Sequence, residues 1–202
     1  MRPAPVRVMC CFLMLTLLFG LTACTRSITY RLDKGGAAEY PERERINLAV
    51  VLVLDRELFE SSYDWTVGGP LTGRTHRLLV GDVLAQNAEP LTRAVFRHVT
   101  IVRPADLAST PPGLITMTLR ALSAHQGGSA YFAWNVVPTT VSIEWTLKSA
   151  DGRVVWVQAV NGLGEGRRDK DFDGFRTALR DAFSKSFELM FASVEIRRVA
   201  SP

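Results

Sequence analysis

The sequence predicts an α+β fold of two layers, in which a mixed sheet of four to five strands carries two main helices on one face. Three observations support this prediction. Apolar runs rich in β-branched residues recur along the chain, as strands require, and two long segments repeat apolar residues at the three- and four-residue steps of a helix. The order is strand, helix, a series of strands and a closing helix, which suits two helices packed together against one face of a sheet.

The first predicted strand covers residues 46–54, a nearly continuous apolar run of the kind that is buried on both faces. Residues 55–75 are expected to be irregular. A helix is predicted over 78–99, where apolar residues recur at helical spacing. Pro90 lies inside it, and because proline has no N–H to donate, we expect it to kink or split the helix, with Pro90 near a new first turn.

Four further strands are predicted, over 98–102, 114–122, 139–148 and 153–162. The first of these is most simply joined to the strand at 46–54 by a right-handed crossover through the helix, which makes the two strands parallel. Asp151-Gly152 is a strong hairpin signal, so the last two strands should be antiparallel.

The closing helix is predicted over 172–194 from one apolar stripe. Asp171 or Asp173 is a plausible amino-terminal cap, because an aspartate side chain accepts hydrogen bonds from the free N–H groups of a first helical turn. The glycine-rich stretch 162–166 suggests a dinucleotide-binding loop, but a charged run follows it and no crossover strand does. We therefore expect a flexible link between strand and helix there.

Residues 1–23 are predicted to be a secretory signal. Arg2 and Arg7 give a positive start, and the apolar run 8–21 would be about 21 Å long as a helix, shorter than the ~30 Å bilayer core. The run ends in Leu21-Thr22-Ala23-Cys24, which resembles the lipobox of bacterial lipoproteins. The resemblance implies that Cys24 is acylated and becomes the first residue of the mature chain. An ordinary signal peptide with an incidental cysteine is the alternative.

The lipobox resemblance also implies a location. Thr25 follows Cys24 where an aspartate would be the usual inner-membrane retention signal, so the expected address is the periplasmic side of the outer membrane. Several acyl chains, such as palmitate, would make the anchoring effectively permanent. Residues 24–45 are expected to form the lipidated cysteine and a polar tether that can extend roughly 65 Å. Residues 46–202 are expected to form a single globular domain.

Composition limits the classes of partner. Loss of Arg2 and Arg7 with the signal brings the formal net charge of +4 closer to zero. The chain has no basic block with interleaved aromatics, so nucleic acid is not a favoured partner. Cys24 is the only cysteine after the signal, so the mature chain can form no internal disulfide and must rely on its core.

The layout is similar to a group of small envelope lipoproteins with a lipobox, a polar tether and one compact domain. The YajG-type lipoproteins, the penicillin-binding-protein activator LpoB and the amino-terminal domain of the TolB family share this plan. The matching features are 46–54, the helix at 78–98, the hairpin at 145–156 and the helix at 172–194, and Pro90 departs from the unbroken helix of the plan. The resemblance implies a non-enzymatic envelope protein that binds another envelope component.

No catalytic, metal or cofactor site is predicted. His76, His98 and His125 have no metal-ligand spacing, and the chain contains no Gly-x-Ser-x-Gly motif, P-loop or free cysteine nucleophile. A cluster of four acidic residues lacks the calcium-loop pattern and is offset by neighbouring arginine and lysine. The cluster consists of Glu165, Asp169, Asp171 and Asp173.

Two groups of aromatic residues could bind a partner. Tyr131, Phe132 and Trp134 lie in an expected loop at 123–138 that also holds two glycines, and aromatic side chains supply large anchor areas. Alternatively, these residues fold back over the sheet as core. Tyr63 and Trp65 lie in the segment expected to be irregular, and their alternative is an aromatic pair tucked against the edge of the domain.

These observations favour a binding or scaffolding lipoprotein that holds a periplasmic or outer-membrane protein in envelope assembly, transport or peptidoglycan synthesis. A second hypothesis is an accessory subunit for lipid or glycolipid export, which needs an apolar cavity between sheet and helices. A hydrolase assembled from residues far apart in the sequence is a third. The oligomeric state is left open by the sequence.

Overall fold

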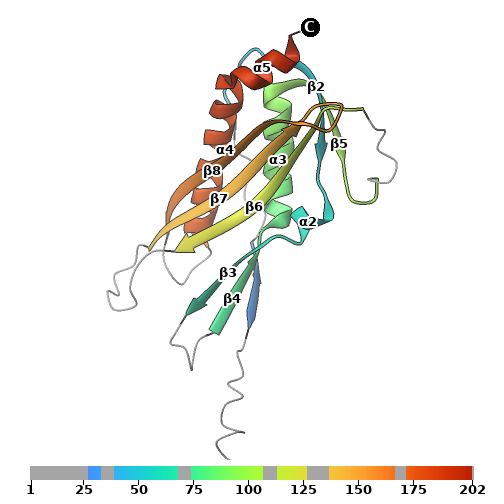
Figure 1. Ribbon diagram of the computed structural model, residues 1–202. Helices are drawn as coiled ribbons and strands as arrows, with labels where there is room; N and C mark the ends of the chain where they lie inside the picture. The colour runs from blue at the N-terminus through green and yellow to red at the C-terminus, as the bar shows by residue number, and fades with distance from the viewer. Residues whose placement is uncertain are drawn as a thin grey trace, which may run out of the picture.

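In the computed structural model, the described residues are 27–32, 39–67, 74–106, 113–126, 137–166 and 172–201. They form an α+β fold with two sheets and confirm the predicted class (Figure 1). The strands are β1 (Ile28–Arg31), β2 (Ile46–Val53), β3 (Ser62–Val67), β4 (Arg74–Leu79), β5 (Phe96–Val102), β6 (Thr116–Gln126), β7 (Val137–Lys148) and β8 (Val154–Gly166). The helices are α2 (Arg56–Phe59), α3 (Gly81–Val95), α4 (Asp173–Ala192) and α5 (Val194–Ala200).

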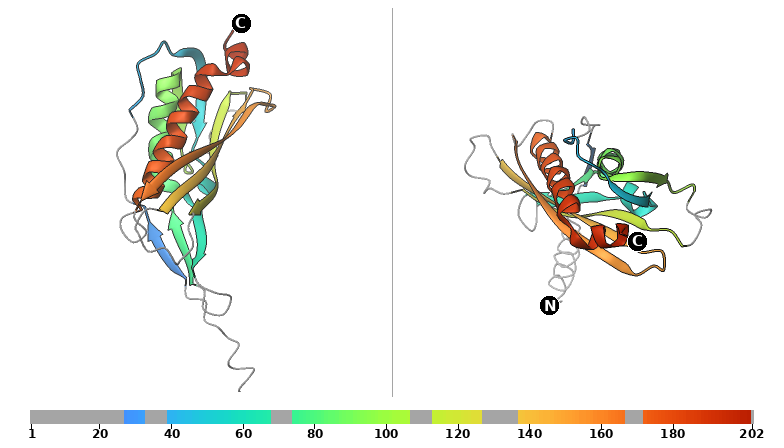
Figure 2. Two further views of the ribbon diagram at one scale, coloured as in Figure 1. Left: turned by 90° about the vertical axis from the view of Figure 1, so that its left-hand side faces the viewer. Right: turned by 90° about the horizontal axis from the view of Figure 1, so that it is seen from above.

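The larger sheet has five strands in the order β5-β2-β6-β7-β8. β2 pairs in parallel with both β5 and β6, so the predicted parallel pairing across the first helix is confirmed. β6, β7 and β8 form an antiparallel meander, and the predicted hairpin between β7 and β8 is present. Gly152 in this turn has a φ of 83°, a conformation that glycine adopts without steric cost. α3 and α4 cover one face of the sheet (Figure 2).

The smaller sheet, in the order β1-β4-β3, was not predicted. β3 lies within the segment expected to be irregular, and β4 begins there and continues into residues predicted to start the first helix. That helix is shorter at both ends than predicted, because residues 78–79 belong to β4 and residues 96–99 to β5. β3 and β4 pair in antiparallel fashion, and β1 adds to β4 in parallel. These strands are short, but β3 alternates Tyr63, Trp65 and Val67 with polar residues, so the sequence did contain a signal for it. The strands are held at the base of the hairpin, where Tyr63 and Leu78 are buried in the main core.

Part of the segment expected to be a polar tether is folded onto the domain. β1 itself lies in this segment, and Leu32 directly after it is only 2% exposed. The chain from Glu39 to β2 then runs along the helical layer, where the Tyr40 ring packs on Phe187 (Figure 2). β1 has only four residues and is stabilised by its hydrogen bonds to β4 together with the packing of Tyr30, so a pattern of hydrophobicity over a longer window missed it.

α3 runs without a break through Pro90, so the predicted split is wrong. Pro90 lies on a partly exposed side, while Leu84, Ala88 and Leu91 are fully buried. Burial of that face offsets the hydrogen bond that proline cannot make, because tertiary packing supplies most of the stability of a helix in a protein. None of the described helices is both long and apolar enough to cross a membrane.

α4 begins differently from the prediction. Its cap position is Phe172, with a left-handed φ of 55° and no capping side chain, and Asp173 is the first residue of the helix. Asp171 lies outside the described residues. α4 ends at Ala192, and a separate α5 follows, capped by the Ser193 hydroxyl, which accepts from the Ile196 N–H.

α4 packs directly on the backbone of β8. Gly162, Gly164 and Gly166 lie within the strand, so the expected flexible link is wrong. A Cβ at Gly162 would lie 2.6 Å from the backbone nitrogen of Ala182, and one at Gly164 would lie 2.5 Å from that of Ala178. Since real Cβ atoms do not approach backbone this closely, these glycines are required for the helix to lie where it does.

The layer between the sheet and the two helices is filled by side chains. Trp145, at 0% exposure, donates its indole N–H to the Ser186 hydroxyl at 3.0 Å and meets the edge of Phe183 with ring centroids 6.0 Å apart. The Ser186 hydroxyl in turn donates to the Ala182 carbonyl at 2.7 Å. The one polar group of this large side chain is thereby satisfied, and the described core is continuous from β2 to α5.

The glycine contact predicts a steric effect on stability. Gly162→Ala should destabilise the protein by about 3 kcal/mol or more, because the new methyl group meets backbone that cannot move aside. Gly152→Ala is the matched control, since its Cβ would meet no atom within 4 Å and its cost comes from the positive φ alone. That cost is about 1–2 kcal/mol. Urea unfolding of both variants measures the difference, and equal losses would contradict the close packing of α4 on β8.

Candidate functional site

The structure describes only some of the residues that the sequence predicts to carry function. Tyr131, Phe132 and Trp134 lie outside the described residues, as does Cys24. Trp65 lies on β3, in register with His76 of β4. Only for Tyr63 is the side chain of a predicted binding residue described.

Tyr63 belongs to the core, so the prediction that it binds a partner is wrong. Its side chain is 3% exposed and its ring stacks on Phe175 with centroids 6.4 Å apart. The hydroxyl donates to the carbonyl of Ser142 at 3.4 Å, and burial raises the pKa of the phenol. Tyr63 therefore joins the smaller sheet to β7 and α4 and is inaccessible to a partner.

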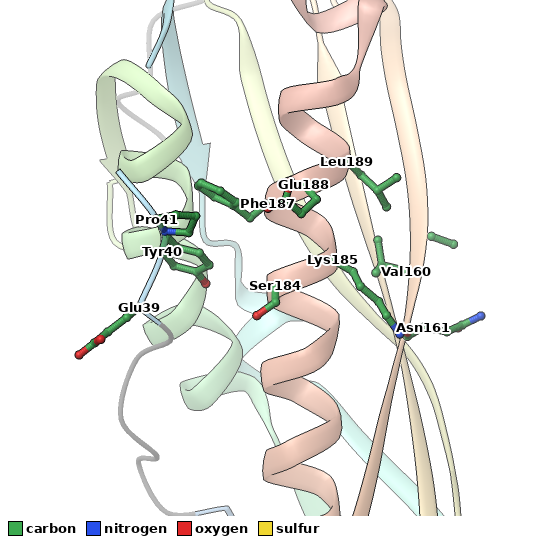
Figure 3. Close-up of a pocket in the computed structure, with 11 residues that line it drawn as sticks. Glu39, Tyr40, Pro41, Val160, Asn161, Ser184, Lys185, Phe187, Glu188 and Leu189 are labelled. Atoms are coloured by element: carbon green, nitrogen blue, oxygen red, sulfur yellow. Dashed lines mark hydrogen bonds between the residues drawn. The ribbon is translucent and has the colours of Figure 1, made fainter. Parts of the chain in front are cut away.

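The candidate site is an apolar groove over the outer face of α4, with a volume of about 550 Å³ (Figure 3). We call it the α4 groove. Residues 39–41 form one wall, residues 159–161 of β8 form the other, and α4 contributes the floor. The floor residues are Ser184, Lys185, Phe187, Glu188 and Leu189.

The first wall is held against α4 by contacts between residues far apart in sequence. Tyr40 stacks on Phe187, with ring centroids 5.1 Å apart and planes 22° apart. Arg43 makes two hydrogen bonds to the Glu188 carboxylate, at 2.8 and 2.9 Å, and its guanidinium lies over the rings of Phe187 and Phe191. A two-pronged arginine–carboxylate contact with stacked rings beneath it has a defined geometry, so this wall is positioned rather than loose.

The second wall is held by the polar groups that close the free edge of β8. The Asp181 carboxylate accepts from the Leu163 N–H at 2.8 Å, and the Lys185 ammonium donates to the Asn161 carbonyl at 3.1 Å. Asp181 and Lys185 also pair with each other at 2.7 Å. Burial acts to raise the pKa of Asp181, but the hydrogen bonds from the Lys185 ammonium and the Leu163 N–H together hold that pKa below its ordinary value.

The chemistry of the α4 groove suits an apolar group. Leu189 presents an apolar surface at 39% exposure, beside Ala159 and Val160. Lys185 is paired with Asp181, and Glu188 with Arg43, so these two charged floor residues are already neutralised. An apolar surface with a balanced polar rim is typical of sites that bind side chains or small molecules.

The hydroxyl of Tyr40 is an exception to the good pairing around the groove. Its oxygen is buried and has no hydrogen-bond partner among the described residues. Burial raises the pKa of this phenol. A buried hydroxyl without a partner costs about 1–3 kcal/mol, so the ring of Tyr40 and not its hydroxyl stabilises the wall.

The described histidines and carboxylates form no cluster of the kind that binds a metal ion. Within the described ranges, no group of three or more histidine, cysteine, aspartate or glutamate residues could hold a metal ion. His76 stacks on Tyr30, with its Nδ1 3.3 Å from the phenol oxygen. His98 and His125 are exposed on two different strands.

The α4 groove is not evident from the sequence, because three separate segments form it. Tyr40 and Pro41 lie among polar residues in the segment expected to be a tether. An aromatic residue and a proline within a polar run were the available signal, since both suit a segment that docks rather than one that remains solvated.

The raised pKa of Tyr63 predicts a loss of stability at alkaline pH. In the unfolded chain a tyrosine ionises at about pH 10, whereas buried Tyr63 keeps its proton to higher pH. The contribution of Tyr63 to the free energy of unfolding is therefore complete below about pH 10 and declines above it. The slope is about 1.4 kcal/mol per pH unit. Urea unfolding from pH ~9 upward should show a shallower decline for Tyr63→Phe than for the wild type. Identical declines would contradict the assignment.

The unpaired hydroxyl of Tyr40 predicts opposite effects for two substitutions. Tyr40→Phe should leave the free energy of unfolding unchanged or raise it by up to about 1 kcal/mol, because only an unsatisfied group is removed. Tyr40→Ala should lower it by about 2 kcal/mol, since the stacking on Phe187 is lost. Thermal and urea unfolding check both, and destabilisation by the phenylalanine would show that the hydroxyl has a partner.

The chain matches no protein-family model, and no curated protein matches its sequence. Its structure is similar to that of the lipoprotein GNA1162 of Neisseria meningitidis, with 14% identity, a TM-score of 0.36, and coverage of 69% of this chain and 98% of that one. A neuraminyllactose-binding hemagglutinin homologue of Helicobacter pylori shares 9% identity over 80% of this chain and 96% of its own, with a TM-score of 0.37. A hypothetical protein of Chlamydia trachomatis shares 12% identity over 73% and 96%, with a TM-score of 0.39. Similarities at this level do not establish a shared function.

Proposed function

We propose that the protein is an exported, lipid-anchored binding protein of the bacterial envelope that holds a partner protein in its α4 groove. The observation that carries the proposal is the groove itself: an open, apolar depression of about 550 Å³ whose walls are held by ion pairs and stacked rings. The signal-like residues 1–23 and the lipobox ending at Cys24 support a periplasmic location on the outer membrane.

The proposed occupant is an apolar side chain or short segment of another envelope protein. Leu189 offers an exposed apolar contact on the floor beside β8, and the neighbouring Lys185 and Glu188 are already paired, so binding there would bury neither of them as an unpaired ion. Burial of a few apolar side chains inside a polar rim is the usual arrangement of a protein interface.

The lipid-handling alternative finds less support. It requires a cavity between sheet and helices, and the described part of that layer is filled by residues with no exposed surface. These include Met117, Ile143, Trp145, Phe183 and Met190. The α4 groove lies on the opposite side of α4, open to solvent.

A charge placed in the groove should abolish partner binding without unfolding the protein. Leu189→Asp puts a carboxylate on the apolar floor and should weaken binding at least tenfold, because burial of an unpaired charge is unfavourable. Val194→Asp is the matched control, since Val194 on α5 is 62% exposed and does not line the groove.

The measurement is chemical cross-linking in intact cells followed by isolation of the tagged protein. The wild type and Val194→Asp should give the same cross-linked species, and Leu189→Asp should lose it. Loss in both variants, or in neither, would contradict a role for the groove. Circular dichroism spectra of the three proteins establish that each is folded.

A further inference from the structure

The first strand of the domain begins very close to the proposed anchor. β1 starts at Ile28, four positions after Cys24. Four residues in a fully extended chain span at most about 14 Å. The point at which the chain joins the folded domain is therefore at most that far from the acylated residue.

β1 is firmly attached to the domain, so this short connection cannot be lengthened by peeling the strand away at little cost. It pairs with β4 from Ile28 to Arg31, and the N–H of Leu32 donates to the Leu79 carbonyl at 3.2 Å. The Tyr30 ring stacks on His76 and meets Phe172 edge-on, with centroids 5.1 Å apart. Leu32 is buried in the core.

The end of the smaller sheet at which β1 begins is also the end at which β3 finishes and β4 starts. Ile28 is level with His76, and the hairpin continues past this level through Thr75 and Arg74, which pair with Thr66 and Val67. Two residue positions correspond to about 7 Å. The hairpin therefore extends from the domain toward the region that the anchor can reach.

The rest of the molecule lies on the other side of this sheet. In Figure 1 the smaller sheet projects from one end of the domain, and α5 and the carboxyl terminus lie at the opposite end.

We propose that the domain stands upright on the lipid surface, with the end of the smaller sheet that holds Ile28 and Thr75 toward the lipid and α5 farthest from the membrane. The inference rests on the proposed anchor at Cys24. It replaces a domain carried on a long tether by one held in a fixed orientation.

The test uses the acylated full-length protein in vesicles of phosphatidylethanolamine and phosphatidylglycerol in which a fraction of the headgroups carry a nitroxide. Thr75→Cys and Ser201→Cys are each labelled with a fluorophore, since acylated Cys24 offers no free thiol. Fluorescence at position 75 should fall at least twofold with nitroxide lipid, and that at position 201 should not change. If the Thr75 variant fails to fold, Arg77→Cys, exposed on the same strand, replaces it.

A second arm separates this inference from the proposed anchor. Insertion of a flexible Gly-Ser segment of about 15 residues after Thr25 should keep the protein on the vesicles but abolish the quenching at position 75, because such a linker lets the domain move away. If the protein without the insertion binds vesicles but its label at position 75 is not quenched, the proposed orientation is overturned and the proposed anchor is not. Failure of the acylated wild type to bind vesicles would overturn both the orientation and the anchor. Failure of Cys24→Ala alone agrees with both.

Discussion

The contact on which the rest of the structure depends is that between the backbones of α4 and β8. Glycines at 162, 164 and 166 allow the helix to lie against the strand at a distance that any side chain would prevent. This position directs Phe183 and Ser186 onto Trp145, which completes the core, and it turns Ser184, Lys185 and Leu189 outward. The filled interior and the open groove are therefore two consequences of one packing constraint.

The same contact also brings α4 side chains to the unpaired backbone groups at the free edge of β8. β8 ends the five-stranded sheet, and an edge strand with unpaired backbone groups invites association with other strands. Because α4 lies so close, Asp181 and Lys185 can reach the Leu163 N–H and the Asn161 carbonyl. This part of the edge is closed by side chains of the molecule's own helix, so the proposed partner would reach the groove through side-chain contacts and not by adding a strand there.

Hydrophobic periodicity predicted the elements whose own spacing of apolar residues indicates which face is buried. The strands over 46–54 and 139–162, the hairpin turn at Asp151-Gly152 and the two long helices all lie where apolar residues repeat at the proper spacing. What failed was each feature that depends on a contact with a distant segment. β1 is stabilised by pairing with β4, Tyr63 by packing on Phe175, and the glycines of β8 by the approach of α4. No local pattern contains such information, and the α4 groove, made of three segments, belongs to the same class.

The placement of β1 also changes what an anchor at Cys24 would mean for the groove. Tyr30 contacts Phe172 at the start of α4, and the groove floor lies toward the other end of that helix, near Leu189. At ~1.5 Å per residue, the 12 to 17 positions from Phe172 to the floor residues place the groove about 18 to 25 Å along α4 from the point where β1 meets it. A domain held upright by a connection of at most about 14 Å would present the groove within a limited range of heights above the lipid. A long tether would let the domain search the periplasm, whereas this arrangement would select partners that themselves lie at the same membrane or extend to that height.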